Sequence, residues 1–231
     1  GYPWRLAKVA ALQGKTEIDR AYYTVAARLL DDEGREAVLS QKVRKDLGGF
    51  RPLDSYQKVM AGCLDENALN RALYFDAKGF LRALLIVEDK LSMAHSVEAR
   101  VPLLDNDMIH RALALPPELR YANGRSKVAL REAMTGLLPE RQIQRRKQGF
   151  TPPDATWFRG PSRPYVEGIL TSERFLDRGY FSANGVRQVL DAHFEGRADR
   201  RFLLWSMMLF EWMNRLFLDP STPLAPDIIT T

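Results

Sequence analysis

The stretch "VEDKLSMAHSVEARVPLLD", residues 87–105, places three consecutive charged residues inside an apolar helical pattern. On a helical wheel of residues 80–98, Leu84 and Leu91 share a face with Glu88, and Lys90 lies beside alanine and valine positions. A helix that is apolar on nearly all sides is typical of a protein core. Charged side chains in such a helix must be paired, hydrated or bound to a ligand.

Two interpretations of these charges follow from the pattern. The first is an internal ion network among Glu88, Asp89, Lys90, Glu98 and Arg100, since structural ion pairs outnumber catalytic ones. The second is that the same side chains line one wall of an active site and contact a ligand there. The spacing alone leaves both interpretations open.

Helical periodicity also dominates the segments before and after this stretch. The segment 66–96 predicts one long helix or two helices joined near Gly79, and alternating strand patterns are nearly absent. We therefore expect a mainly α protein, with one structural region over 1–218 and a flexible tail over 219–231. Further helical patterns cover 17–34, 35–49, 54–62, 105–115, 124–139, 182–196 and 202–218.

The composition narrows the class of protein. The 231 residues are 45% apolar and carry a formal net charge of +5, which is ordinary for a globular protein. One cysteine, Cys63, excludes an internal disulfide, and we expect it to be a small core residue. The most apolar segment, 202–218, is short and carries charges, so it predicts a buried helix. We expect a cytoplasmic protein with no signal peptide and no membrane partner.

A second candidate site is the basic run "RRKQGF", residues 145–150. Three consecutive cations before a glycine suit a phosphate or pyrophosphate, although a solvated charge run is the simpler interpretation. The run "NGRSK", residues 123–127, predicts a helix cap rather than an anion site. The three histidines lack the spacing of metal ligands, so we expect no metal site.

These motifs together resemble the synthetase domain of glutamine-dependent asparagine synthetases of the class B type. "EDKLSMAHSVEARVPLLD" carries the resemblance, with Leu103 where phenylalanine is usual. "GRSKVALREAMTGLLPERQIQRRKQGF", "PDATWFRG" and an aromatic last helix with "WSMMLFEW" follow in the family's order. The resemblance covers residues 1–218 and is tightest over 74–160.

The resemblance implies a fold and a reaction. This chain would be the helical C-terminal portion of a pyrophosphate-loop (adenine nucleotide alpha hydrolase-like) α/β synthetase domain. The family uses ATP and Mg²⁺ to adenylate aspartate, and ammonia from glutamine then gives asparagine. The chain shows no Ser-Gly-Gly-X-Asp-Ser loop, no acidic nucleotide motif and no glutaminase domain. We therefore expect this chain alone to bind neither ATP nor Mg²⁺ tightly and to make no asparagine.

The resemblance also assigns roles to catalytic residues. Lys147 matches the lysine that neutralises charge on the phosphates during adenylation. Lys90 and Arg100 match positions that approach the nucleotide or the substrate carboxylates. A cation that meets charge as it develops on a leaving pyrophosphate stabilises the transition state more than the ground state.

Four acidic residues complete the expected site. Glu98 and Asp105 would orient Arg100 and anchor the loop, and Glu88 and Asp89 would lie on the same wall. The expected partners are aspartate, ATP and ammonia or glutamine, which would act through an N-terminal portion. We expect no nucleic-acid partner, and a homo-oligomer is possible. Two alternatives are an amide ligase or cyclase for another carboxylate and a basic nucleic-acid-binding module that uses Arg141, Arg145, Arg146 and Lys147.

Overall fold

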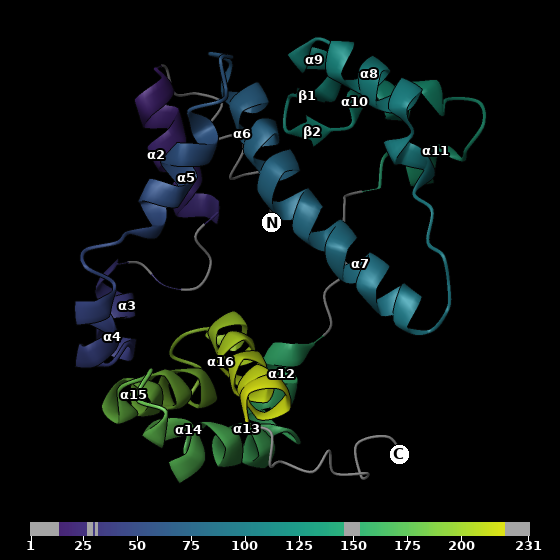
Figure 1. Ribbon diagram of the computed structural model, residues 1–231. Coiled ribbons are helices and arrows are strands. Elements are labelled where there is room, and N and C mark those ends of the chain that lie inside the picture. Colours follow the sequence, from purple (N-terminus) through teal and green to yellow (C-terminus); the bar gives the residue numbers. More distant parts are fainter. Residues whose placement is uncertain (1–13, 27–29, 31, 146–152, 220–231) are drawn as a thin grey trace. The chain divides into compact units, whose positions relative to one another are not determined.

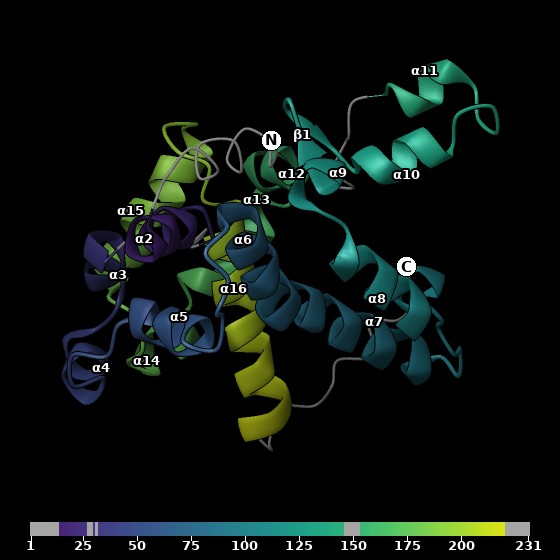
Figure 2. The same ribbon diagram turned by 90° about the horizontal axis from the view of Figure 1, so that it is seen from above.

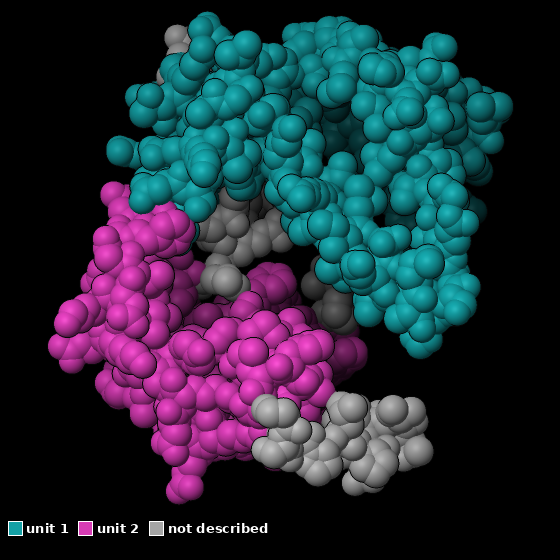
Figure 3. All heavy atoms as spheres, viewed as in Figure 1, with its two compact units in different colours: residues 1–26, 52–148 teal, residues 27–51, 149–231 magenta. Residues whose placement is uncertain are grey.

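The computed structural model describes residues 14–26, 30, 32–145 and 153–219, and they are mostly helical (Figure 1). The expectation of a mainly α protein is confirmed. The chain forms two compact units, one from residues 1–26 and 52–148 and the other from residues 27–51 and 149–231 (Figure 3). The tail beyond Asp219 lies outside the described residues.

The first unit has its core at the junction of three helices, α2 (Lys15–Ala26), α5 (Pro52–Met60) and α6 (Ala68–Asp76). Ile18 and Tyr22 of α2 are four residues apart and therefore point to the same side of the helix. Cys63 is buried among them, which confirms its prediction as a small core residue. The buried cluster consists of Ile18, Tyr22, Tyr56, Met60, Cys63, Ala68 and Ala72.

Helix α6 continues without interruption into the helix that carries Glu88, Asp89 and Lys90. A π-helical turn, η1 (Ala77–Leu81), joins α6 to α7 (Arg82–Ala94), and Gly79 lies inside that turn. The views in Figures 1 and 2 show the resulting long helical run. The expected helical segment 66–96 is therefore confirmed, with its junction at Gly79.

The rest of the first unit contains short elements. These are η2 (Pro102–Leu104), α8 (Asn106–Ala114), α9 (Pro117–Arg120), β1 (Tyr121–Ala122), β2 (Arg125–Ser126), α10 (Val128–Ala133) and α11 (Glu140–Ile143). The two strands pair antiparallel, and Asn123 and Gly124 between them have φ of 51° and 75°.

The run "NGRSK" lies directly before α10 and supplies its N-cap residue, Lys127, but its first two residues form a turn instead. Asn-Gly forms the two-residue hairpin turn for which both positions need positive φ. The N-cap of α10 is Lys127, whose side chain makes no capping hydrogen bond. The helix expected over 124–139 is reduced to α10, and the short α11 begins only after that range, at Glu140.

The second unit is built from α3 (Asp32–Val38), α4 (Gln41–Asp46), α12 (Asp154–Arg159), α13 (Arg163–Leu170), α14 (Glu173–Asp177), α15 (Ala183–Phe194), α16 (Arg201–Met213) and the π-helical η3 (Asn214–Leu218). Ser182 caps α15 as predicted, since its hydroxyl accepts a hydrogen bond from the N–H of Gly185 at 3.3 Å. The core consists of Val38, Phe158, Val166, Ile169, Leu170, Phe175, Val186, Val189, Leu190, Leu203, Leu204, Met207 and Met208.

Two expected helices end at other residues than the pattern indicated. The pattern over 17–34 and 35–49 is divided among α2, α3 and α4, and Gly34 lies inside α3 instead of ending a helix. The helix expected over 202–218 is α16 with η3, and it buries one face while Trp205 and Leu209 on another remain exposed. No helix in the described part of the chain is long and apolar enough to cross a membrane.

Candidate functional site: the charged end of α7 and the loop to α8

Helix α7 carries Glu88, Asp89 and Lys90, and none of its side chains is buried. The expectation of a core helix was therefore wrong. The physical reason is that α7 packs chiefly against η1, its own continuation. No described residue from Ala77 to Gln142 is buried, so the apolar side chains of α7 also lie at the surface. Apolar periodicity signals a face that can be buried, not the presence of a second surface to cover it.

The ion network expected among five residues is reduced to one pair. Nη2 of Arg100 lies 2.5 Å from Oε1 of Glu98, and both side chains are more than two-thirds exposed. Glu88, Asp89 and Lys90 form no ion pair within the described ranges. A single exposed pair contributes little to stability, at most about 1 kcal/mol. The network interpretation therefore does not explain why α7 is charged.

The loop after α7 has a defined backbone. His95 ends the helix, Ser96 has a φ of 57°, and the N–H of Val97 donates to the carbonyl of Ser92 at 2.9 Å. At the other end, Oδ1 of Asp105 accepts a hydrogen bond from the N–H of Asp107 at 3.0 Å and caps α8. Asp105 thus anchors the loop that carries Glu98 and Arg100, while its effect on catalysis stays a prediction.

Lys147, the residue given the main role in charge neutralisation, lies outside the described residues. The chain is described up to Arg145, and its carbonyl contacts a side chain that the sequence analysis did not single out. Nη1 and Nη2 of Arg131 each lie 3.3 Å from the Arg145 carbonyl oxygen, and Nε donates to the carbonyl of Ser126 at 3.0 Å. Arg131 belongs to the quoted motif "GRSKVALREAM", which was its only sequence signal.

Buried charges occur elsewhere, where the sequence analysis did not expect them. Glu211 of α16 is fully buried, and Arg178 and Arg215 donate to its carboxylate at 2.5 Å and 2.6 Å. Burial raises the pKa of Glu211, but the hydrogen bonds from both arginines outweigh burial and hold the pKa below its usual range. Arg178 and Arg174 likewise lower the pKa of Asp219 to about 2. These groups tie α14 to the end of η3.

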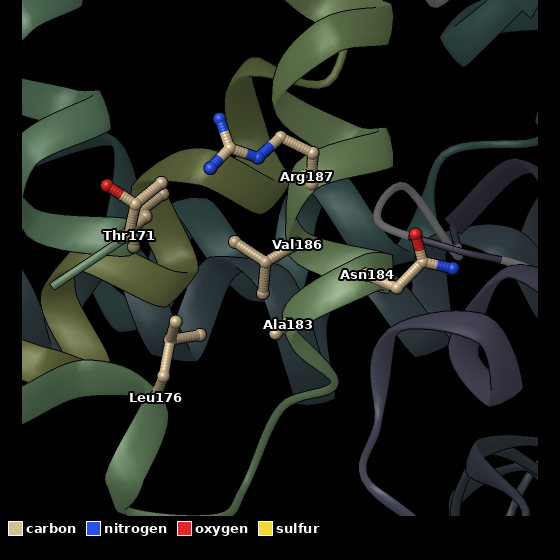
Figure 4. A pocket seen from close by; sticks show the side chains of 7 residues that line it. Thr171, Leu176, Ala183, Asn184, Val186 and Arg187 are labelled. Atoms are coloured by element: carbon tan, nitrogen blue, oxygen red, sulfur yellow. The ribbon is translucent and has the colours of Figure 1, made fainter. Parts of the chain in front are cut away.

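A small pocket in the second unit holds none of the predicted site residues. Figure 4 shows Thr171, Asn184 and Arg187 as its polar groups, with Leu176 and Val186 among its apolar ones. Arg187 lies 3.9 Å from Glu167, so its charge has a partner at the surface. Nothing in this lining matches the chemistry expected of the motif at residues 87–105.

The donor set at α7 suits an anion more than a metal. Lys90 and Arg100 supply N–H donors for a phosphate or carboxylate. Among the described residues, no three His, Cys, Asp or Glu side chains are grouped to hold a metal ion.

The described residues thus form a helical region that carries a charged motif, with donors suited to an anion, between α7 and α8. The sequence model of the "Asparagine synthase" family matches residues 1–215, and the chain belongs to this family.

Curated relatives agree with the family match. The chain is 29% identical over 205 residues to "Asparagine synthetase [glutamine-hydrolyzing] 1" of Bacillus subtilis, which covers 86% of this chain and 32% of that protein. It is 28% identical over 216 residues to a putative asparagine synthetase of Mycobacterium tuberculosis, covering 91% and 32%. The mouse asparagine synthetase is 33% identical over 153 residues, covering 58% and 26%. This chain thus spans about a third of the length of the first two relatives. No solved structure matches it.

Proposed function

We propose that this chain is the helical part of an asparagine synthetase that makes asparagine from aspartate, ATP and ammonia released from glutamine. The observation that carries the proposal is the family match over residues 1–215, which includes every residue of the candidate site. The exposed charges of α7 support it, because Glu88, Asp89 and Lys90 have no structural ion pairs in the described residues to account for them. The comparisons do not favour either alternative, the ligase for another carboxylate or the nucleic-acid-binding module.

In the proposed reaction, a side-chain carboxylate oxygen of aspartate attacks the α-phosphorus of ATP. Pyrophosphate leaves with the electron pair of the broken P–O bond, and an acyl adenylate forms. Ammonia then attacks the acyl carbon, AMP leaves, and a proton is lost from the new amide nitrogen. Lys147 places a fixed positive charge at the departing pyrophosphate, where charge develops only as the bond breaks.

Lys90 and Arg100 act in this proposal as anion-binding groups for the nucleotide or the aspartate carboxylates. Glu98 holds one end of the Arg100 guanidinium through their 2.5 Å contact, which leaves other N–H donors of the fork free to bind a carboxylate. Asp105 limits the motion of the loop by capping α8. Glu88 and Asp89 add negative charge beside Lys90 and keep an amine or ammonium near the same wall.

The test is ATP–pyrophosphate exchange with aspartate, run on the full product of the gene that encodes this chain and on the 231-residue chain in parallel. We expect exchange from the full product and none from the 231-residue chain. Aspartate-independent exchange, or no exchange from the full product, would contradict the proposal. Salt-sensitive binding to DNA with no exchange would favour the nucleic-acid-binding module instead.

Lys147→Ala in the full product tests the charge-neutralising role. Loss of a cation that acts only in the transition state should lower kcat by about a hundredfold or more and change the KM for aspartate by less than about threefold. Lys58→Ala, at an exposed position of α5, is the matched control and should retain the parent rate. Equal losses in kcat and in aspartate affinity would contradict the assignment.

A further inference from the structure

We propose that the exposed side of α16 is a surface through which this chain binds the rest of the synthetase, the part that lies outside these 231 residues. The inference rests on the proposed function, which makes this chain one part of a longer enzyme. It assigns a role to a surface of the second unit that carries none of the proposed catalytic residues.

Helix α16 is apolar on two opposite sides. The side that faces the core of the second unit buries Leu203, Leu204, Met207 and Met208. The exposed residues of α16 are Phe202, Trp205, Ser206, Leu209 and Met213, and none of them is charged. A helix that covers a core with one face usually carries charged or polar residues on the other. Helix α16 therefore has a second apolar side that its own core does not use.

The exposed apolar residues follow the period of a helix. Successive members are three or four positions apart, and residues at these separations lie on one side of a helix. We call this set the outer stripe, and it consists of Phe202, Trp205, Leu209 and Met213 of α16 and Leu216 of η3. Between 41% and 60% of each residue is exposed. The outer stripe is thus a continuous apolar surface along the last helical run of the second unit.

The arginines near the two ends of the outer stripe are already paired within the second unit. Arg201, the first residue of α16, lies 3.4 Å from Asp154 and 3.5 Å from Asp199. Arg215 of η3 donates to the Glu211 carboxylate at 2.6 Å. Because these charges are neutralised by their partners, the stripe is suited to an apolar surface and not to an anion such as nucleic acid.

The size of the outer stripe indicates what kind of partner covers it. Its five half-exposed side chains present roughly 400 Å² of apolar surface. A stable complex of separate chains buries about 800 Å² on each partner. Two parts of one chain pack over about 300–750 Å² on each side, because their connection keeps them at a high local concentration. The stripe is therefore too small for a stable dimer of this chain and is sufficient for a contact within one longer chain.

The lengths of the relatives are consistent with such a longer chain. This chain spans about a third of the asparagine synthetases of Bacillus subtilis and Mycobacterium tuberculosis. A synthetase of that length has about two-thirds of its residues available to cover the outer stripe. We therefore assign the stripe to an apolar face of that remaining part, with contacts that high salt should not weaken.

The first experiment measures the accessibility of a thiol and needs no enzymatic activity. Cys63 is the single cysteine of this chain and is buried, so an introduced cysteine gives a distinct signal. Leu209→Cys should react rapidly with a maleimide in the 231-residue chain, since position 209 is 60% exposed. In the full product of the gene, the same position should react at least about tenfold more slowly, at low and high salt alike. Labelling is read from the masses of the peptides.

Gln188→Cys, at an exposed position of α15, is the control and should react at the same rate in both proteins. Equal rates at position 209 in the two proteins would overturn the proposal, and so would a gene that encodes only these 231 residues. Protection of position 209 in the 231-residue chain would overturn it as well. It would assign the stripe to a second copy if protection increases with protein concentration, and to another segment of the same 231 residues if it does not.

The second experiment compares the effect of one polar substitution on the two proteins. Leu209→Gln should lower the midpoint of thermal unfolding of the full product by about 4 °C or more, because it buries an amide without a partner. In the 231-residue chain it should shift the midpoint of the second unit by less than about 1 °C, as is usual at an exposed position. Leu64→Gln, at a leucine that is 86% exposed in the first unit, is the matched control and should change neither midpoint by more than about 1 °C.

Equal shifts by Leu209→Gln in both proteins would contradict a contact that only the full product makes. Neither experiment depends on catalysis. Loss of aspartate-dependent ATP–pyrophosphate exchange with position 209 still protected would contradict the proposed function and leave the interface standing. Exchange by a full product in which position 209 is freely labelled would do the reverse.

Discussion

At the residue scale, Arg71 uses all three guanidinium nitrogens to connect segments of the first unit. The side chain of Arg71 is 3% exposed, and Nε and Nη2 lie 2.8 Å and 2.5 Å from the Asp19 carboxylate. Nη1 donates to the carbonyls of Cys63 and Asp65 at 3.1 Å and 2.8 Å. The hydrogen bond that Arg71 donates to Asp19 is the main reason why the pKa of Arg71 lies above its usual value. One side chain thus connects α2, α6 and the segment between α5 and α6.

Arg71→Met should destabilise the first unit by about 3 kcal/mol, because it leaves Asp19 and two carbonyls without their donor. Urea unfolding followed by circular dichroism measures the change in the free energy of unfolding. Asp19→Asn combined with Arg71→Met should cost less than the sum of the single changes, since both remove the same ion pair. An additive double variant would show that the pair is not the source of the stability.

In the second unit, His193 is a buried titratable residue. It is fully buried, and its Nδ1 accepts a hydrogen bond from the N–H of Arg200 at 3.1 Å. Burial lowers the pKa of His193, and the nearby Arg159 lowers it further, while Asp199 at 3.9 Å opposes the shift. The folded protein favours neutral His193 more than the unfolded chain does. His193 therefore stabilises the folded state above pH 6.5, and this stabilisation is lost as the pH falls below 6.5.

We expect the free energy of unfolding of the second unit to decrease between pH 6.5 and 5 by at most about 1.4 kcal/mol per pH unit. His193→Gln keeps an acceptor near the Arg200 N–H and does not titrate, so its stability should be flat over this range. Denaturant midpoints at several pH values measure the difference. A parallel pH dependence in both proteins would assign the effect to another group.

At the scale of elements, the junction of α3 and α15 depends on a close backbone approach. A Cβ added at Gly185 would lie 2.2 Å from the Ala37 carbonyl oxygen and 2.8 Å from the Cα of Val38. Ser182 N–H also donates to the Val38 carbonyl at 2.8 Å, so α15 cannot move away without breaking that bond. Gly185→Ala should therefore destabilise the second unit by about 1–3 kcal/mol, the usual cost of overpacking.

Gly168→Ala is a matched control for this substitution. Gly168 lies within α13, and a Cβ there would meet no atom within 4 Å. Alanine should stabilise this helix by about 0.5–1 kcal/mol, because it restricts the unfolded chain. Thermal unfolding of both variants checks the opposite signs. Equal destabilisation by the two alanines would contradict the packing argument.

At the scale of the whole molecule, the two units have separate buried clusters and separate buried ion pairs. In the second unit, Glu211 is held by Arg178 and Arg215, and Arg178 also contacts Asp219 at 2.6 Å. Glu211→Gln removes the buried negative charge between two half-buried arginines and should cost about 3 kcal/mol.

We expect each of these substitutions to change the stability of only one unit. Glu211→Gln should lower the unfolding transition of the second unit and leave that of the first unit in place, and Arg71→Met should do the reverse. Because separate cores unfold separately, two transitions are expected in denaturant. Hydrogen exchange read by peptide assigns each transition to its residues. One transition that both variants shift equally would contradict independent units.

Local patterns were sufficient for much of this fold. The junction at Gly79, the Ser182 cap and the buried Cys63 follow from residue types and their neighbours along the chain. The hairpin at Asn123 and Gly124 was equally local and was missed, because its two-residue strands are too short to show alternation. Helix existence was thus predictable, and the ends of the short helices were not.

The charged stretch shows where local patterns fail. Its periodicity predicts which face of α7 is apolar, but burial requires a second surface, and periodicity says nothing of that surface. Glu88 and Lys90 were expected inside and are exposed. Among the described residues, the buried charges Arg71 and Glu211 pair with Asp19 and Arg178, which lie 52 and 33 residues away along the chain. Pairs at such separations leave no period in the sequence.

By itself, the sequence determined that this protein is mainly helical and which family its motifs resemble, because helix formation and a motif of consecutive residues are both local properties. Only the tertiary structure decided which charges are buried and which carbonyls Arg131 holds. The reason is that desolvation and hydrogen bonding depend on distances between segments that are far apart in the chain.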